Sequence, residues 1–409
     1  MADTTRAQVI MRTRISDKIT KTFEQDAILL DLFMQGKAQT NNTLGAGIAA
    51  YVSPNPSFGA MAEAAYFPVP GETEDVLMKV YSVDQAQTGK ISGRLMDIPD
   101  DLMLEGALSL NTKRDTLTFK KKLSQFCYGD ASGSLGVVAT SGISGLNVTF
   151  GGARGSSQIL KGARLQFYTA GGTQHAGTIG AAAVCTVLSN NLATGVVAFD
   201  QLPSNAADAD IVVYEGSYGL GFHGLAYHVN DDTGTYQGVS RASYATLRAT
   251  VLDAAGGSLT VAMIDKILKR MRVALGVNVP LDDIVMISHP DQELAYRTLG
   301  YALNRVVPLG QGTSKFDLSF GMASHMGLRW KLDNDCPRDR IYFLRMSSFQ
   351  RFMNRNPGLL IDENGDSLHL KPGSGTYAWE YHYYMLCSGD IGCINPLANG
   401  CIKNLALVA

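Results

Sequence analysis

The sequence lacks several features that would place it in a common class. No apolar run approaches the ~20 residues that a membrane-spanning helix needs, and no secretory signal opens the chain. Charged residues make up 18% of the 409 residues, below the usual quarter. The net charge of −2 argues against a protein that wraps nucleic acid with clustered Lys and Arg. Such a low charge fits a subunit that buries much surface against neighbours.

Six cysteines are present, and none is part of a Cys-x-x-Cys pair: Cys127, Cys185, Cys336, Cys387, Cys393 and Cys401. The spacing of the last three fits neither a zinc ribbon nor a zinc finger. We therefore expect reduced, buried thiols of a protein made in a cytoplasm, and no bound metal.

Two glycine- or acid-containing patterns resemble known motifs without completing them. Residues 219–224 match Gly-x-Gly-x-x-Gly after an expected strand, but no helix follows, so the pattern favours a flexible connection. Residues 362–366 begin like a calcium loop, yet Ser367 stands where glycine is required and Gly373 where glutamate is required. That segment is therefore interpreted as a hairpin turn.

The histidines form no catalytic or metal-binding pattern. His223 and His228 lie five residues apart without a His-Glu-x-x-His sequence, and each is expected to be a surface or core residue. Ser288 and His289 follow an expected strand, but neither a Gly-x-Ser-x-Gly nor a Cys–His arrangement accompanies them. The sequence thus predicts no catalytic, cofactor-binding or metal-binding residues, and it indicates a protein that is not an enzyme.

The first 95 or so residues show no compact core pattern. Apart from one helical stretch near residues 24–36, the first 53 residues are polar or small. Strand-like runs at 76–81 and 91–95 flank a polar, glycine-containing segment, so a hairpin with its tip at 84–90 is expected. Because an isolated hairpin is marginally stable, this region is expected to pack on a later domain or, as we favour, on neighbouring copies.

A long helix is predicted over residues 98–128. Pro99 and the acidic residues after it suit its first turn, and lysines at 120–122 suit its end. The expected buried stripe consists of Leu104, Leu108, Leu117, Phe119, Leu123 and Phe126.

A separate small β unit is predicted over residues 155–218. Its candidate strands are separated by glycine-rich or polar turns and lie at 163–168, 181–188, 195–199 and 211–214.

The remainder predicts an α+β domain. A helix at 258–275 carries Val261, Ile264, Leu268, Met271 and Leu275 at helical spacing. A buried strand is expected at 284–288, a helix from 290 to 299, and further strands at 341–344 and 376–386.

Taken in order, these parts resemble the major capsid protein of tailed bacteriophages, with the Hong Kong 97-like fold. Residues 224–241 look like the family's glycine-rich connection before a Gly-Gly-(Ile/Val)-(Asp/Ser)-Arg sequence. Here Gln237 stands where the first glycine of that pair is expected, and Arg241 ends the motif. Residues 155–218 resemble the small β-barrel insertion of some members.

The resemblance implies seven segments. They are an N-terminal arm (1–55), an extended E-loop hairpin (56–97), the spine helix with the first part of a peripheral domain (98–154), the inserted β domain (155–218), a connection with peripheral-domain residues (219–257), an axial domain (258–370) and C-terminal strands that close the peripheral domain (371–409).

The resemblance also implies a function. Many copies would form hexamers and pentamers of an icosahedral head around double-stranded DNA, which the inner face contacts without sequence specificity. Further implied partners are a portal and scaffold or decoration proteins, with no membrane and no cofactor. The implied location is the virion, after synthesis in the host bacterial cytoplasm. Some relatives cross-link a loop lysine to a neighbour's asparagine; Lys79 and Lys90 lie in the expected loop, but nothing identifies a partner.

Two alternatives remain open. An encapsulin-like compartment shell would share the fold, and a nucleotide-dependent α/β enzyme would use residues 219–224 with Ser288 and His289. If the expected hairpin packs only on other copies, deletion of residues 70–98 leaves a folded subunit that cannot assemble.

Overall fold

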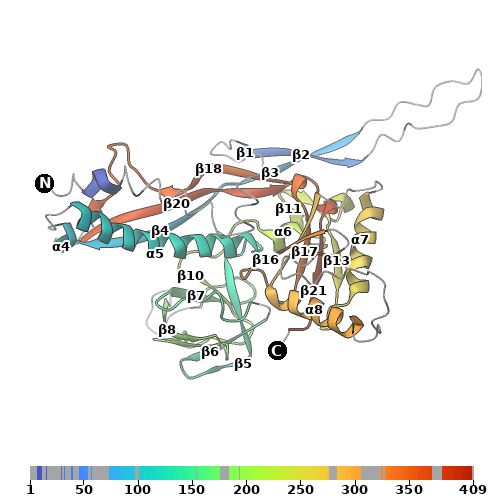
Figure 1. Cartoon of the computed structure of the whole chain (residues 1–409), viewed down its shortest axis with the longest axis horizontal. Coiled ribbons are helices and arrows are strands. Elements are labelled where there is room, and N and C mark those ends of the chain that lie inside the picture. The colour runs from blue at the N-terminus through green and yellow to red at the C-terminus, as the bar shows by residue number, and fades with distance from the viewer. Residues whose placement is uncertain are drawn as a thin grey trace, which may run out of the picture.

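The computed structural model describes residues 73–96, 101–152, 154–175, 184–192, 194–275, 283–304, 324–325, 328–370 and 380–407, together with residues 7–11, 15, 29, 32, 38–39, 46–53 and 57. A long sheet with a helix along it joins an α/β unit at one end, and a closed barrel lies beside the helix (Figure 1). One hydrophobic core connects the long sheet, the helix and the α/β unit.

The long sheet is built mainly from β18 (Phe349–Leu359) and β20 (Glu380–Cys393), which pair antiparallel. The strand β4 (Val83–Ser92) pairs with β20 over its whole length, from Val83 opposite Gly389 to Ser92 opposite Glu380. Short strands β1 (Ala38–Gln39) and β19 (His369–Leu370) complete the sheet.

The helix α5 (Asp101–Cys127) confirms the predicted long helix and follows the single turn α4 (Gly93–Met96). Its 27 residues span about 40 Å at 1.5 Å per residue. Two threonines on its buried side donate their hydroxyls one turn back, Thr112 to the Leu108 carbonyl at 2.8 Å and Thr116 to the Thr112 carbonyl at 2.6 Å. Of the predicted stripe, the buried members are Leu104, Leu108, Phe119, Leu123 and Phe126. Leu117, expected among them, is instead 46% exposed.

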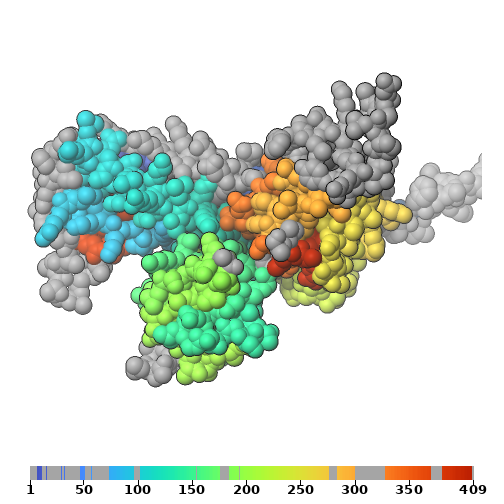
Figure 2. Space-filling model, turned by 60° about the horizontal axis from the view of Figure 1, so that its bottom comes forward, coloured from blue at the N-terminus to red at the C-terminus, as the bar shows by residue number. Residues whose placement is uncertain are grey.

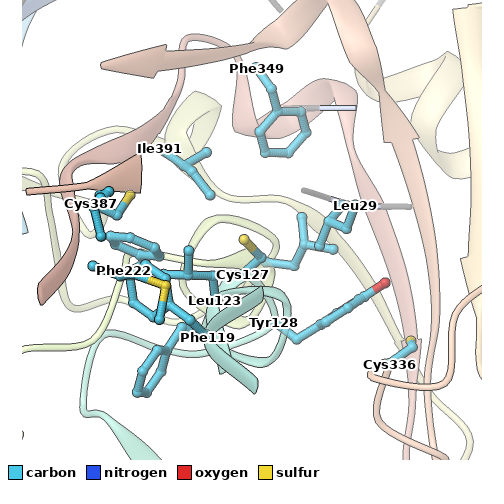
Figure 3. Packing of buried hydrophobic residues seen from close by; sticks show 14 of the residues in the cluster. Leu29, Phe119, Leu123, Cys127, Tyr128, Phe222, Cys336, Phe349, Cys387 and Ile391 are labelled. Carbon is cyan, nitrogen blue, oxygen red and sulfur yellow. The ribbon is translucent and has the colours of Figure 1, made fainter. Parts of the chain in front are cut away.

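The main core lies at the end of α5, where the helix, a loop and two strands meet (Figure 3). Its labelled members include Phe119, Leu123, Cys127, Tyr128, Phe222, Phe349, Cys387 and Ile391. All six cysteines are buried and unpaired, as expected. Burial raises the pKa of the Cys185 and Cys387 thiols to about 12, so both stay protonated at neutral pH.

The α/β unit has a six-stranded sheet of order β13-β21-β17-β14-β16-β15. The strands are β13 (Thr250–Asp253), β21 (Gly400–Lys403), β17 (Ile341–Arg345), β14 (Ile284–Ser288), β16 (Leu328–Leu332) and β15 (Ser324–His325). The helix α7 (Val261–Leu275) packs Ile264, Leu268 and Met271 into its core, as predicted, and α8 (Pro290–Asn304) follows β14. Trp330 fills the centre and donates its indole N–H to Ser288 Oγ at 2.8 Å.

A closed six-stranded barrel forms the third part, with order β10-β5-β6-β9-β8-β7. Its strands are β5 (Ser134–Ser144), β6 (Asn147–Gly151), β7 (Arg164–Tyr168), β8 (Cys185–Asn191), β9 (Val196–Phe199) and β10 (Ile211–Tyr214). The interior is its own cluster of apolar side chains, in which Phe167 and Phe199 pack edge to face. The barrel begins at β5, so the boundary at residue 155 was placed too late. The small and polar residues of 134–144 hid its first strand.

The expected hairpin tip at residues 84–90 is wrong. These residues form the middle of β4, with Asp84, Thr88 and Lys90 exposed and Gln85 buried, as in a strand with one covered face. Gly89 gives no turn; a side chain there would collide with the Tyr383 ring and with Asp115. The hairpin is instead β2 (Ala46–Ser53) with β3 (Glu74–Val80), so β2 belongs to the loop and not to the arm.

The start of the chain also differs from expectation. Ala7, Ile10, Met11 and Ile15 are buried in the main core of their own subunit, and Leu29 joins them. The predicted dependence of the first 95 residues on neighbouring copies is therefore wrong for these side chains and for β4. Deletion of residues 70–98 would remove β4 from the sheet, so the expectation that the deleted chain stays folded no longer holds.

Candidate functional site

The β2–β3 hairpin projects from the body of the molecule (Figure 1). Its base is held by side chains that point from both strands into a small cluster of buried residues: Ile48, Ala50, Met78, Val80, Tyr236, Val239, Leu247 and Phe352. The backbone N–H of Lys79 donates to the Gln237 carbonyl at 2.9 Å. We call the segment 223–248, on which the hairpin rests, the hairpin anchor.

A tight turn at the edge of the hairpin anchor receives β3. It connects β11 (Thr235–Tyr236) with β12 (Val239–Ser240). Gln237 and Gly238 have φ of 47° and 86°, the left-handed values that a two-residue hairpin turn of the primed type requires. Glycine adopts such values without strain. Gln237 adopts the strained conformation here, and both polar atoms of its side-chain amide are buried without a hydrogen-bond partner among the described residues.

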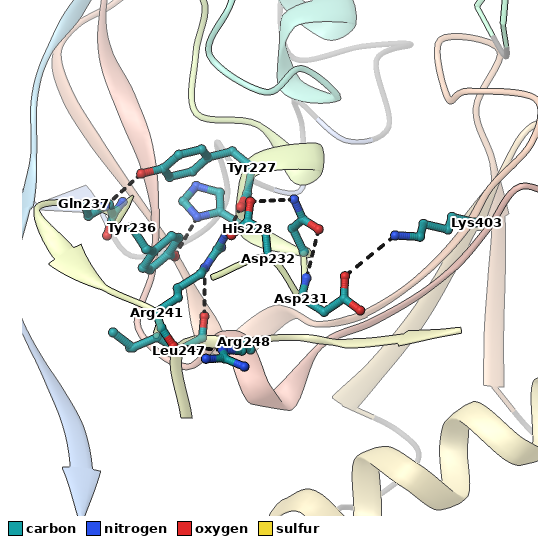
Figure 4. A network of polar contacts seen from close by, with 11 residues as sticks. Tyr227, His228, Asp231, Asp232, Tyr236, Gln237, Arg241, Leu247, Arg248 and Lys403 are labelled. Carbon is teal, nitrogen blue, oxygen red and sulfur yellow. Dashed lines mark hydrogen bonds and ion pairs between the residues drawn. The ribbon is translucent and has the colours of Figure 1, made fainter. Parts of the chain in front are cut away.

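Arg241 holds the hairpin anchor together from inside (Figure 4). Its side chain is 1% exposed. Nη1 pairs with Asp232 at 2.6 Å, Nη2 donates to the Tyr227 carbonyl at 2.7 Å, and Nε donates to the Leu247 carbonyl at 3.1 Å. The guanidinium also lies 4.4 Å from the centre of the Tyr236 ring. A planar group with five donors satisfies these divergent acceptors at once, which a lysine cannot do.

His228 connects the hairpin anchor to β20. Nε2 lies 3.0 Å from the Ile391 carbonyl, so this nitrogen carries the proton and Nδ1 accepts from the Tyr236 hydroxyl at 2.7 Å. Complete burial, with smaller contributions from His223 and Arg241, lowers the pKa of His228 to about 3. The ring is therefore neutral and serves as a fixed bridge between the two elements.

A buried carboxylate completes this contact. Asp390 on β20 pairs with His223 Nδ1 and accepts the backbone N–H of His223 at 3.0 Å and its neighbour Ile391 at 2.8 Å. Burial raises the pKa of Asp390, while the hydrogen bonds oppose that change. His223 and His228 thus have structural partners, as the sequence predicted for core histidines.

Residues 219–224 form the connection that leads out of the barrel. Gly219 donates to the Ser132 carbonyl at 2.9 Å and Gly221 to the Ala131 carbonyl at 3.2 Å, so the two chain segments cross closely. A side chain on Gly221 would press on Gly133, and one on Gly224 would collide with the Cys127 carbonyl. The glycines permit this backbone contact and form no phosphate loop, because only α6 (Leu225–His228), a single turn, follows.

The remaining sequence candidates also have structural roles. Ser288 accepts from Trp330, and His289 contacts Asp291 at the start of α8, so they do not face each other as a nucleophile and base. Asp362 accepts the backbone N–H groups of Asn364 and Asp366, which confirms the turn. Within the described residues no group of three potential ligands could hold a metal ion, and no helix is long and apolar enough to cross a membrane.

A cleft of about 720 Å³ opens where α5, the barrel and the loop after β16 meet. Leu117 of α5 and Leu192 of the barrel stand at its edge. Lys120, Lys121, Arg154 and Arg338 line it, against the carboxylates Asp333 and Asp335. Tyr128 donates to Asp333 at 2.8 Å, and burial raises the pKa of Asp335. Sequence patterns could not reveal this cleft, because its walls come from three distant parts of the chain.

Neither a protein-family model nor a curated protein matches the chain. Several solved structures match it. A chain of the cyanophage A-1(L) capsid asymmetric unit matches with a TM-score of 0.53 and 12% identity, over 93% of this chain and 93% of that one. A chain of the native GTA particle capsid matches at 0.48, with 12% identity over 93% and 91%. A Gordonia phage Cozz chain also matches at 0.48, with 11% identity over 94% and 87%. From its likeness to the cyanophage chain, this protein has the α+β fold of a phage capsid subunit, as expected for the Hong Kong 97-like fold class.

Proposed function

We propose that the chain is a major capsid protein, a structural subunit and not an enzyme, whose copies build the head of a tailed phage. The observation that carries the proposal is the match to the cyanophage capsid chain along nearly the full length of both. A domain-sized fragment shared with an unrelated protein would not give such coverage. The function rests on the fold, since the described residues offer no catalytic arrangement to compete with it.

The geometry supports assembly. The β2–β3 hairpin projects from the body yet has a firmly packed base, so it can reach another copy without losing its orientation. Leu77, which points away from the base, is 61% exposed and is available for such a contact. The proposal includes hexamers and pentamers as the assembled units, and the division of the chain into arm, E-loop, spine helix, barrel, axial and peripheral parts, with the boundaries corrected above.

The proposed partners follow from the same function. They are other copies of the chain, a portal, scaffold or decoration proteins, and double-stranded DNA held on the inner face without sequence specificity. The net charge of −2 supports a wall along which DNA moves without strong binding. The proposed location is the virion, with synthesis in the host bacterial cytoplasm.

Sedimentation and electron microscopy of the purified chain test this function. Capsomers or closed particles of megadalton mass are expected. Particles that carry protein cargo and no nuclease-protected DNA in infected or producing cells would favour the compartment shell. A small oligomer that never forms capsomers at any salt or concentration would contradict both shells and reopen the enzyme hypothesis.

A further inference from the structure

The outer face of α5 carries a regular apolar stripe. Met103, Leu110 and Leu117 follow one another at intervals of seven residues and are 67%, 53% and 46% exposed. Residues seven apart lie on one side of a helix. Single exposed apolar residues are ordinary, but a stripe with this repeat along an uncovered helix is typical of a site where another helix packs. In Figure 2, α5, in cyan, lies at the surface beside the green barrel.

Positive charge accompanies the stripe. Lys113, Arg114 and Lys121 are exposed next to it, whereas the two acidic residues between positions 102 and 121, Glu105 and Asp115, are half-buried. None of the three cations has an ion pair within the described part of the chain. A second copy of the same face would bring like charges together, which is unfavourable. A partner with acidic flanks is complementary to it.

The stripe leads into the cleft described above. Leu117 stands at the end of the stripe and at the edge of the cleft, opposite Leu192, which is 70% exposed. Farther in, Arg154 donates to the Tyr128 carbonyl at 2.7 Å and to the Ser134 carbonyl at 3.2 Å, so its guanidinium is already held by this chain. The two exposed leucines beside the cleft suit the apolar end of a polypeptide segment.

Duplex DNA fits this face less well. Its phosphates need a continuous row of cations, whereas here three leucine or methionine side chains separate the charges. An apolar stripe with basic flanks is therefore complementary to a protein segment and not to duplex DNA.

We propose that this face of α5, together with the cleft, binds an acidic amphipathic helix of another protein. The helix lies along Met103, Leu110 and Leu117, its carboxylates meet the three exposed cations, and its apolar end packs on Leu117 and Leu192 beside the cleft. The inference deepens the proposed function, because it assigns a chemistry to a partner other than a second copy. It does not require that shells form.

The test uses a fluorescein-labelled peptide of three heptads with the repeat Leu-Ala-Glu-Leu-Glu-Gln-Ala, titrated with the purified full chain. Fluorescence anisotropy should show saturable binding. Leu110→Glu and Lys113→Glu should each weaken it about tenfold or more, because each adds a negative charge against the acidic helix. Since both positions are exposed, both variants should fold, and circular dichroism verifies this.

Three controls decide the outcome. Leu188→Glu, at a barrel leucine that is 52% exposed and outside the stripe, should bind as the parent does. The same peptide with Lys at every Glu should not bind. A duplex DNA of about 20 base pairs should bind weakly and without response to Leu110→Ser.

No binding of the acidic peptide, equal binding of the basic one, equal weakening by Leu188→Glu, or tight DNA binding that ignores Leu110→Ser would overturn the inference. Peptide binding by subunits that never form capsomers would leave the inference standing and contradict the proposed function. Particles formed by subunits that do not bind the peptide would contradict the inference and support the proposed function.

Discussion

The barrel and the β2–β3 hairpin are both β structures, but their buried side chains find partners in different places. The barrel fills its interior with residues from its own six strands and from Ile159 in the connection between β6 and β7. The hairpin has no interior, and its four inward side chains pack on Tyr236, Val239, Leu247 and Phe352 of the body. The barrel is thus stabilised locally, whereas the orientation of the hairpin depends on the hairpin anchor. Damage to one should leave the other intact.

The strongest way to break this comparison is Phe167→Ala in the barrel. Phe167 is fully buried and contacts Phe199, so the cavity should cost about 3–5 kcal/mol of the free energy of unfolding. Limited proteolysis should then cut within residues 134–214 while the hairpin base stays protected. Equal loss of protection in the hairpin would show that the barrel is not an independent unit.

Arg241→Ala should have the next largest effect on stability. It should act on the hairpin anchor and not on the barrel. The carbonyls of Tyr227 and Leu247 lose their donor and the Tyr236 ring loses its cation, for a loss of about 2–4 kcal/mol. Hydrogen exchange should become faster in β3 and at residues 225–248, with the barrel unchanged. Arg241→Lys should restore little, since one ammonium cannot reach all three acceptors; full rescue by lysine would mean that charge alone matters.

Acid should weaken the hairpin anchor through His228. Its pKa of about 3 in the folded chain lies below the ordinary value near 6.5, so below pH 6.5 the unfolded chain binds a proton that the folded chain does not. The contribution of neutral His228 is present above pH 6.5 and declines toward pH 3, by about 2 kcal/mol between pH 7 and 5. Burial raises the pKa of Asp390, so the folded chain binds a proton there more readily than the unfolded chain does. This contribution to stability grows as the pH falls and therefore opposes that of His228.

Comparison with His228→Asn isolates the histidine. Stability of the parent, measured by denaturant unfolding at pH 7, 6 and 5, should fall more steeply than that of the variant. Parallel curves would indicate that the pKa of His228 is the same in the folded and the unfolded chain.

Gln237→Gly should give the smallest change in stability, and it is the only one of these variants that should be more stable than the parent. Glycine adopts φ of 47° without strain and removes a buried amide that has no partner; together these should stabilise the anchor by about 1 kcal/mol. The melting temperature should rise modestly. Gly238→Gln, a matched exchange at the next left-handed position, should lower it; a gain there as well would refute the turn geometry.

Much of the architecture was predictable because it follows from local periodicity. Helix α5, helix α7, strand β14 and the last strands of the barrel appear in the sequence with clear spacing. One missed signal was local too. Ala7, Ile10, Met11 and Ile15 have the spacing of one helix face, which indicated that these side chains are buried.

The errors occurred where distant residues determine the outcome. Gly89 suggested a turn, yet it is glycine because Tyr383, almost 300 residues later, packs on it. Leu117 fits the apolar pattern of α5 but lies on its open side. The hairpin anchor was foreseen only as a family-like sequence ending in Arg241. Its ties to β20 through His228 and Asp390 depend on chain segments more than 150 residues apart.

The close crossing of the chain at Gly133 and Gly221 has a practical consequence. The polypeptide leaves the body and returns to it at nearly the same point, joined by the bonds from Gly219 to Ser132 and from Gly221 to Ala131. A foreign module whose own two ends lie as near each other is therefore a suitable replacement between residues 133 and 216. Such an exchange leaves the long sheet untouched and turns the barrel's position into a platform for displaying cargo.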